Sequence, residues 1–480
     1  MNLLKNIKSL TSDTILYGMS SVLTQLAGLF LVPFYTKELS PKEYGIIALF
    51  AMVGGFLNPI LSLGLDSALF RYFSMGKSLF LKIRLFSSAF YVKVIFVTFC
   101  VLILTLCKDP LNEYIFSNKI SNELYYLFLG SLFVQNVSSL AYVSLRAERK
   151  VKKIVFANII ALVISLSLSI WLVLIVKLGV IGVLLAGLSS SIVQSILFFA
   201  FIRSNINFKM VGIKKIKRLF NYGIPLIPHK LIGQGLNLFV LFLINNQLGL
   251  VVAGLFAVAK KFGKPLSFIV SMVQTAWSPY KFDIHKNESN PALVFKEIIT
   301  IYLFSLITLW SLLSLIAPIL FRYLIDERYW DGIPYIPFIM LISVFEAFKF
   351  TISTGFELSK DQKKASIISF YTLLVVLGFV YLSFDYLRPY NFMIAQMLGY
   401  LFFGIYIYTK AKKIILIQYP FKLLISFFVF SGCVVLYNYQ THQTCTIVLM
   451  VSLLQLVSTV VVVVKFIGYS RIKKRLKIKL

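Results

Sequence analysis

The sequence predicts an all-α integral membrane protein with about fourteen transmembrane helices. Its 480 residues are 59% hydrophobic and only 14% charged, and its mean hydropathy is +0.86. Soluble domains are roughly half apolar and a quarter charged. Apolar runs follow one another almost from end to end, and the loops between them are alternately rich and poor in basic residues. Together these observations exclude a soluble fold.

The spans follow from the length of the apolar runs, because crossing a bilayer takes about 20 mostly apolar residues. The first run, after Lys5 and Lys8, extends from Thr14 to Tyr35. It is longer than a signal-peptide core and lacks a clear cleavage site, so we expect a retained first span. The predicted spans are residues 13–35, 45–65, 86–107, 124–145, 154–176, 179–202, 222–245, 251–275, 298–321, 334–356, 365–384, 390–409, 417–438 and 444–464.

The basic residues test this topology, because short cytoplasmic loops of membrane proteins are enriched in Lys and Arg. With the N-terminus inside, the predicted inner segments hold 34 basic residues and the outer loops hold 8. We therefore expect both termini in the cytoplasm. The net charge of +30 is mainly a topology signal, with some attraction to membrane lipids, and nucleic acid is not expected as a partner. The basic tail from Arg471 to Lys479 is expected at the inner leaflet.

The chain has no soluble domain, and its natural midpoint is a basic cytoplasmic segment. After this segment the chain weakly echoes its own beginning, which favours two parallel bundles with substrate between them. The echoes are Tyr17-Gly18 with Tyr222-Gly223, and Tyr44 to Phe50 with Ala253 to Val258. We predict an N-terminal six-helix bundle at 1–203, a cytoplasmic linker at 204–220, a C-terminal six-helix bundle at 221–411, and two extra helices with a basic tail at 412–480.

Four motifs carry a resemblance over the whole chain. They are LSPKEYG at 39–45, LGLDSALFRY at 63–72, NYGIPLIP at 221–228 and AWSPY at 276–280. Together they resemble the polysaccharide transporter family, the O-antigen and capsular repeat-unit flippases. This family shares the MOP superfamily with multidrug (MATE) exporters and the lipid II flippase.

The resemblance implies a MATE-like pair of bundles in the bacterial cytoplasmic (inner) membrane. It implies alternating access that moves an undecaprenyl-pyrophosphate-linked oligosaccharide to the outer leaflet for O-antigen, lipopolysaccharide, capsule or exopolysaccharide assembly. A polysaccharide polymerase and a chain-length regulator are the protein partners that it implies. No cofactor is expected.

Six basic residues lie within the predicted spans, and these point to an anionic ligand. They are Lys93, Lys230, Lys260, Lys261, Lys264 and Lys349. Six such charges facing lipid at mid-membrane would cost on the order of 15 to 20 kcal/mol, so most must face protein or a watery cavity. Lys230 and Lys260 lie near the midplane, and Lys260, Lys261 and Lys264 share a helix face. We predict that these four lysines bind the lipid-linked anionic oligosaccharide.

Other charged residues have two interpretations each. Lys93 either lines the cavity or extends to the membrane surface, and Lys349 either lines it or pairs with Glu346 three residues away. Asp66 and Glu346 are the acids that could exchange a proton during transport. Arg71, in the second motif, is a further candidate for the cavity or for an ion pair.

Enzymatic function is not expected, because the sequence contains no nucleotide-binding loop and no nucleophile–histidine–acid set. The four cysteines are scattered without metal-ligand spacing, so no metal site is predicted. The main alternative is a MATE-type multidrug or cation antiporter, which would hold its ligand with carboxylates. A second alternative is the lipid II flippase, whose pattern of several cavity arginines is missing here. A membrane polymerase or ligase would show a large outer loop.

Overall fold

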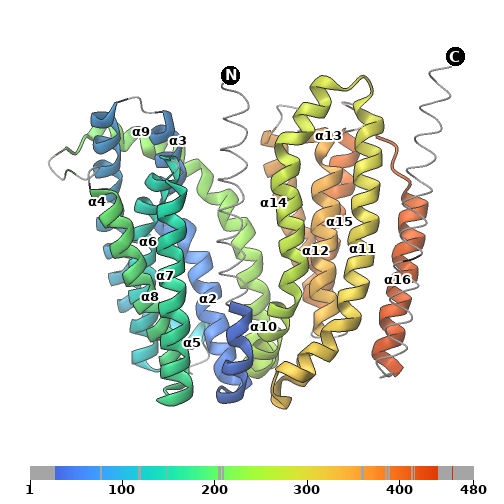
Figure 1. Cartoon of the computed structure of the whole chain (residues 1–480), viewed down its shortest axis with the longest axis horizontal. Helices are drawn as coiled ribbons and strands as arrows, with labels where there is room; N and C mark the ends of the chain where they lie inside the picture. The colour runs from blue at the N-terminus through green and yellow to red at the C-terminus, as the bar shows by residue number, and fades with distance from the viewer. Residues whose placement is uncertain are drawn as a thin grey trace. The chain divides into compact units, whose positions relative to one another are not determined.

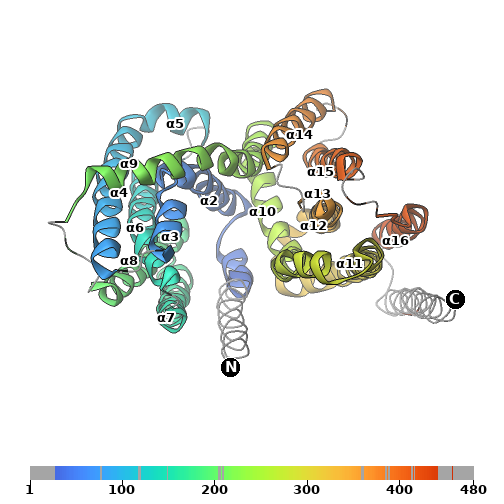
Figure 2. The same cartoon turned by 90° about the horizontal axis from the view of Figure 1, so that it is seen from above.

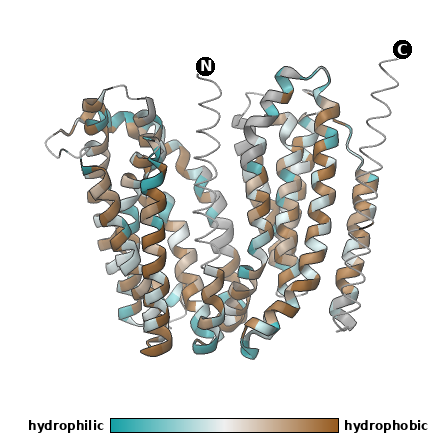
Figure 3. Cartoon of the chain, viewed as in Figure 1, coloured by the Kyte–Doolittle hydropathy of each residue, from teal (hydrophilic) through white to brown (hydrophobic). Residues whose placement is uncertain are grey.

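The computed structural model confirms an all-helical membrane protein (Figure 1). It describes residues 28–75, 78–116, 120–148, 150–203, 207, 210–357, 362–383, 386, 390–411, 415, 417–441 and 457. Within these residues, nine helices are long and apolar enough to cross a membrane, and shorter apolar helices lie at Ile367–Leu382 and Phe421–Tyr437. Hydrophobic residues dominate most of the helices (Figure 3).

Each predicted span from 45–65 to 417–438 coincides with a helix, with ends that differ by several residues. The predicted span 444–464 and the basic tail lie outside the described residues, apart from Val457, and so does the first half of span 13–35. The total of fourteen spans therefore stays a prediction.

Two compact units make up the chain, Met1–Ala257 (unit 1) and Val258–Leu480 (unit 2). This division follows contacts within the fold and not repeats in the sequence. The predicted six-helix bundles and their linker at 204–220 remain a proposal.

Unit 1 is built from long helices whose contacts centre on α6. Helix α6 packs against α3, α4, α7 and α8. Buried apolar residues from α3, α4, α6, α7, α8 and α9 form one core cluster, with Phe73 and Phe86 fully buried. After residues 28–38, which are helical, the helices are α2 (Pro41–Leu61), α3 (Leu65–Met75), α4 (Leu79–Leu106), α5 (Lys108–Tyr114), α6 (Asn122–Ala147), α7 (Val151–Ser169), η1 (Ile170–Ile175), α8 (Gly179–Phe201), α9 (Ile213–Gly223), η3 (Ile224–Leu226) and the first part of α10 (Ile227–Asn287).

The first resemblance motif specifies where α2 begins. The Ser40 hydroxyl accepts a hydrogen bond from the Glu43 amide, and the Glu43 carboxylate accepts one from the Ser40 amide at 2.8 Å. This capping box satisfies two otherwise unpaired amides, and Pro41 occupies the first turn, where no amide proton is needed.

Two glycines allow the start of α2 to meet α10 backbone to backbone. A Cβ on Gly45 would collide with the Leu250 carbonyl oxygen, and a Cβ on Gly254 would collide with the Pro41 carbonyl oxygen. Pro41 precedes Gly45 by four residues, and Leu250 precedes Gly254 by four residues. The contact is therefore nearly two-fold symmetric. The two segments that echo each other in the sequence are thus in contact within unit 1.

Helices α9 and α10 follow from local sequence. Figure 2 shows α9 running across the ends of α3 and α4, against which it packs. Its alternation of Ile, Leu and Lys suits a helix that is apolar on one side only. Helix α10 covers both predicted spans 222–245 and 251–275, but Gly249 interrupts it with φ of 83°. This left-handed conformation favours glycine and separates the two spans.

Unit 2 contains the rest of α10 and a group of helices linked by pairs of buried side chains. The Trp277 indole donates to the Thr354 hydroxyl at 2.9 Å, and the Trp310 indole donates to the Pro337 carbonyl at 2.9 Å. The helices are α11 (Pro291–Leu324), η4 (Glu327–Gly332), α12 (Tyr335–Ile352), α13 (Thr354–Glu357), α14 (Gln362–Leu382), α15 (Asn391–Ala411) and α16 (Phe421–Thr441). Helix α15 packs against α12 and α14, and α11 packs against α12 and α16.

Candidate functional site

A buried ion pair joins α3, α4 and α6 in unit 1. Lys93 is 0% exposed, and its Nζ lies 2.7 Å from Asp66 Oδ1, whose side chain is 25% exposed. The same ammonium donates to the Ser139 hydroxyl at 2.6 Å, and Ser139 in turn reaches Asp66 Oδ1 at 2.9 Å. A buried lysine needs such partners because an isolated charge is costly in a low-dielectric interior. The structure thus places the Lys93 ammonium in a buried ion pair with Asp66 and not at the end of a side chain that extends to the membrane surface.

Lys230 lies beside this pair but has a different partner. Its Nζ donates to the Ser67 hydroxyl at 2.8 Å, and it lies within electrostatic range of Lys93. Among the residues that the structure describes, no carboxylate pairs with Lys230. Two lysines and one aspartate therefore meet here, and the cluster of Asp66, Lys93 and Lys230 carries one net positive charge.

Arg71 belongs to a cation–aromatic cluster instead. Its guanidinium lies 4.5 Å from the ring centre of Tyr222 on α9, and the guanidinium of Arg218 on α9 lies 4.3 Å from the ring centre of Tyr72 on α3. The two tyrosine rings meet edge to face at 5.9 Å. Such contacts are worth about 0.5 to 1 kcal/mol each at exposed sites. The arrangement links α3 to α9.

The other three predicted ligand lysines lie in unit 2. Lys260 and Lys261 are partly buried, and Lys264 is exposed. Lys264 lies within electrostatic range of both, as their spacing on one helix predicts. Within the described part of the chain, no carboxylate is paired with any of the three.

Glu346 and Lys349 lie on α12 among aromatic side chains of unit 2. Glu346 is within electrostatic range of the hydroxyl groups of Tyr302 and Tyr400. The Lys349 Nζ lies 4.7 Å from the ring centre of Tyr400 and 5.0 Å from that of Phe403. The structure thus places the Lys349 ammonium over rings of α15. The pairing of Lys349 with Glu346 stays a prediction.

Unit 1 contains a cavity of about 550 Å³, here called the polar cavity. It adjoins the ion pair, because Ser139 belongs to both. Most of its lining residues carry a hydroxyl or an amide, and none carries a charge. They are Gly28, Leu31, Gln135, Ser138, Ser139, Tyr142, Asn158, Ala161, Leu162, Ser165, Leu166, Ser190, Ser191, Gln194 and Phe198.

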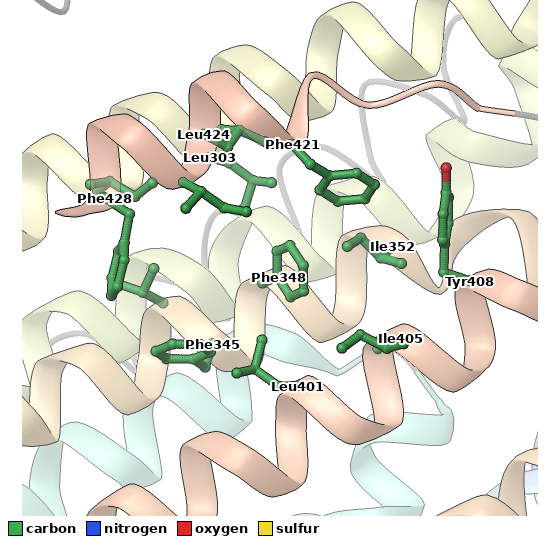
Figure 4. A pocket seen from close by; sticks show the side chains of 14 residues that line it. Leu303, Phe345, Phe348, Ile352, Leu401, Ile405, Tyr408, Phe421, Leu424 and Phe428 are labelled. Atoms are coloured by element: carbon green, nitrogen blue, oxygen red, sulfur yellow. The ribbon is translucent and has the colours of Figure 1, made fainter.

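Unit 2 contains a cavity of about 410 Å³ with the opposite character. Figure 4 shows its labelled side chains, which are hydrocarbon except for the hydroxyl of Tyr408. They come from α11, α12, α15 and α16. The Tyr408 hydroxyl already donates to the Ile417 carbonyl at 3.0 Å, so the cavity suits apolar groups.

The lysines could be identified from the sequence because charges in apolar runs are rare. The polar cavity was not predicted from the sequence, although the spacing of polar residues on α6 indicates it. On α6 the polar residues Gln135, Ser138, Ser139 and Tyr142 recur at the spacing of one helix face. Single serines in a span cost little, so hydropathy alone hides them.

Among the described residues, no cluster of His, Cys, Asp or Glu is arranged to hold a metal ion.

A family model described as "Polysaccharide biosynthesis protein" matches residues 37–334 of the chain. A comparison with curated protein sequences finds no match.

Several solved transporter structures share the fold. An inward-facing MATE multidrug resistance transporter of the MOP superfamily aligns with a TM-score of 0.62 at 15% identity, covering 82% of this chain and 95% of that one. The lipid II flippase MurJ, in an inward closed conformation, aligns with a TM-score of 0.58 at 15% identity over 97% of this chain and all of that one. A MOP superfamily transporter from Pyrococcus furiosus, described by the reverse polarity of its binding pocket, aligns at 0.54 and 15% identity, covering 85% and 94%. At these identities the fold alone is shared.

Proposed function

We propose, from the premise that this chain belongs to the polysaccharide biosynthesis protein family, that it is a flippase for a lipid-linked oligosaccharide repeat unit. The repeat unit is carried on undecaprenyl pyrophosphate and moves from the cytoplasmic to the outer leaflet for O-antigen, capsule or exopolysaccharide assembly. The setting is the bacterial cytoplasmic membrane with both termini in the cytoplasm. Family and fold both agree with the prediction of a transporter rather than an enzyme.

The observation that carries the proposal is the surplus cation beside the buried ion pair. The Asp66 carboxylate is 2.7 Å from Lys93, whereas Lys230 is held by the Ser67 hydroxyl. A hydroxyl leaves the ammonium charge uncompensated, and an ammonium has three donors. Lys230 is therefore able to bind an anionic oxygen, and a pyrophosphate supplies several.

The three lysines of α10 in unit 2 independently support an anionic substrate. Lys264 repels both Lys260 and Lys261 on one side of the helix. Like charges at this spacing destabilise a helix by about 0.2 to 0.5 kcal/mol per pair, and burial of the charges adds to this cost. An anionic ligand would offset both costs.

Two of the structural relatives are consistent with this proposal. One is a flippase of lipid II, itself a lipid-linked substrate. Another is described by a binding pocket of reverse polarity within the same superfamily. We infer that the MOP fold here uses cationic side chains to bind an anionic substrate, in place of the carboxylates that would hold cationic drugs.

The multidrug exporter is the main alternative, and the state of Asp66 argues against it. A cation antiporter needs a carboxylate that is available to its ligand. In unit 1 the carboxylate of Asp66 already accepts from Lys93 and Ser139. Asp66, whose side chain is 25% exposed, and Glu346 in unit 2 both stay candidates for proton exchange.

The test replaces Lys230, Lys260 and Lys264 singly with Ala in a strain that makes the repeat unit, and measures surface polysaccharide. Hydrogen bonds to charged groups contribute about 1.5 to 3 kcal/mol, so we expect roughly a tenfold or larger loss of export. Lys152→Ala, which removes an exposed lysine of α7, is the charge-matched control. Full export by all three variants at normal membrane levels would refute the cationic site, and increased sensitivity to cationic drugs would favour the exporter.

A further inference from the structure

The polar cavity of unit 1 is lined by α6, α7, α8 and the helix at 28–38, and its polar lining residues come from α6, α7 and α8. Helix α7 contributes Asn158 and Ser165, which lie two turns apart, and α8 contributes Ser190, Ser191 and Gln194. These residues share a face because positions three, four and seven apart line one side of a helix. Polar side chains from three helices thus converge in the apolar region of a membrane protein, which indicates a cavity able to hold a partly polar occupant.

The lining can donate and accept hydrogen bonds but carries no charge. The Gln194 side-chain amide donates to the Asn158 side-chain oxygen at 2.9 Å, and the second N–H of the Gln194 amide is a further donor in the lining. Hydroxyls of Ser165 and Ser191 add donors that also accept. An uncharged ligand whose own groups both donate and accept is the match for such a wall.

Two aromatic rings lie together in the lining of the cavity. Tyr142 on α6 and Phe198 on α8 both line it, with ring centres 5.8 Å apart. Flat rings next to hydroxyl and amide groups suit a ligand with one apolar face and polar edges. A sugar ring has this form, since its C–H bonds gather on one face and its hydroxyls project from the edge.

The volume and the neighbouring charges support the same ligand. About 550 Å³ lies within the usual range of 300 to 1,000 Å³ for small-molecule sites. The cavity meets the Asp66–Lys93 pair through Ser139, which is hydrogen bonded to both. A cation would find no carboxylate in the lining and an anion would find no lysine there, so an uncharged ligand fits best.

We propose that the polar cavity binds uncharged sugar residues of the transported oligosaccharide. This inference rests on the proposed function and deepens it, because it assigns the glycan and the pyrophosphate to different residues. The sugar hydroxyls bond to the side chains of α6, α7 and α8, and the charged group is left to the lysines.

The test measures binding to the full chain in lipid nanodiscs with two probes. The first is the source strain's repeat-unit oligosaccharide, released from lipid, dephosphorylated and with its carboxylates reduced to alcohols. The second is undecaprenyl pyrophosphate without sugar. The double variant Asn158→Leu/Gln194→Met removes both members of one amide pair, so neither of the two is left without the other, and it keeps side chains of similar size. We expect affinity for the first probe to fall roughly tenfold or more and affinity for the second to stay unchanged.

A matched control exists in the same unit. Asn136 on α6 donates to Asn58 on α2 at 2.8 Å, and neither residue lines the polar cavity. Asn58→Leu/Asn136→Leu should therefore leave the binding of both probes as in the wild type. Ser165→Leu, which fills part of the cavity without breaking the amide pair, should reproduce the loss of glycan binding.

The outcomes separate the two proposals. If the wild type binds sugar-free undecaprenyl pyrophosphate but not the uncharged glycan, or if both cavity variants bind the glycan normally, the cavity holds only water and the inference is overturned. If cavity variants lose both probes equally, the assignment of separate sites is wrong. The cavity inference is supported if the wild type and the control bind the glycan and the cavity variants lose it. If Lys230→Ala then binds the second probe as tightly as the wild type, the proposed cationic site is refuted while the cavity inference is kept.

Discussion

The buried pair of Asp66 and Lys93 offers the sharpest test of the energetics of unit 1. Replacing Asp66 with Asn removes the carboxylate charge and leaves the Lys93 ammonium 0% exposed, with the uncharged oxygens of Ser139 and of the new amide to accept from it. Replacing Lys93 with Met leaves a carboxylate that is 25% exposed and still accepts from Ser139. The two single variants should therefore differ, because only the aspartate has partial access to solvent.

The expected loss of folding free energy follows from the distance between the two charges and from their burial. At 2.7 Å two unit charges attract by about 6 kcal/mol at an effective dielectric constant of about 20, and desolvation of the two ions offsets much of this. Removing one member of a buried pair costs about 3 to 5 kcal/mol. We expect Asp66→Asn to lie in this range and Lys93→Met to cost about 1 to 3 kcal/mol, since partial exposure lets water stabilise the remaining charge.

The double variant Asp66→Asn/Lys93→Met should be close to the wild type in stability. It removes both charges, and replacing a whole buried pair with uncharged groups is often nearly neutral. The assay is a double-mutant cycle on the free energy of unfolding in mixed micelles, followed by tryptophan fluorescence. Because the double variant is expected near zero, the coupling energy equals the sum of the two single effects, about 4 to 8 kcal/mol. If the two single effects add in the double variant, the ion pair makes no contribution and the reasoning fails.

Two further predictions concern packing and coupling. Gly254→Ala should destabilise the protein by about 1 to 3 kcal/mol, because the new methyl group would overlap the Pro41 carbonyl oxygen. Gly187→Ala, at a position with no atom within 4 Å of the new Cβ, should instead be neutral or stabilising by up to about 1 kcal/mol; equal unfolding midpoints for the two variants would contradict the close approach of α2 and α10. Glu346→Gln should weaken the dependence of transport on a pH gradient, and unchanged transport across such a gradient in proteoliposomes would eliminate Glu346 as the proton carrier.

Much of the helical framework could be predicted from the sequence. Gly249, which breaks α10 with a positive φ, lies in the gap predicted between spans seven and eight. Runs of apolar residues specify membrane helices strongly, because the bilayer leaves a chain few ways to satisfy its backbone. The ends of the helices were less certain, since capping depends on single side chains such as Ser40 and Glu43.

The candidate site was predictable only in part. Charged residues such as Lys93 and Lys230 are visible in a linear sequence because each one interrupts an apolar run. Their partners are not visible, because Lys93 meets Asp66 and Ser139 across 27 and 46 residues of chain. The resemblance motifs marked Asp66 and Arg71, but only the structure assigned one to a buried ion pair and the other to an aromatic cluster.

The sequence alone determined that this is a helical membrane protein, because composition and the length of apolar runs are local properties that need no knowledge of packing. It also determined which few residues carry charge into the membrane. Tertiary structure decided which of those charges are neutralised, and it brought the serines and amides of α6, α7 and α8 to one cavity. The reason is physical, since a charge or a hydroxyl acquires its energy from the atoms that surround it, and in a helical bundle those atoms come from distant parts of the chain.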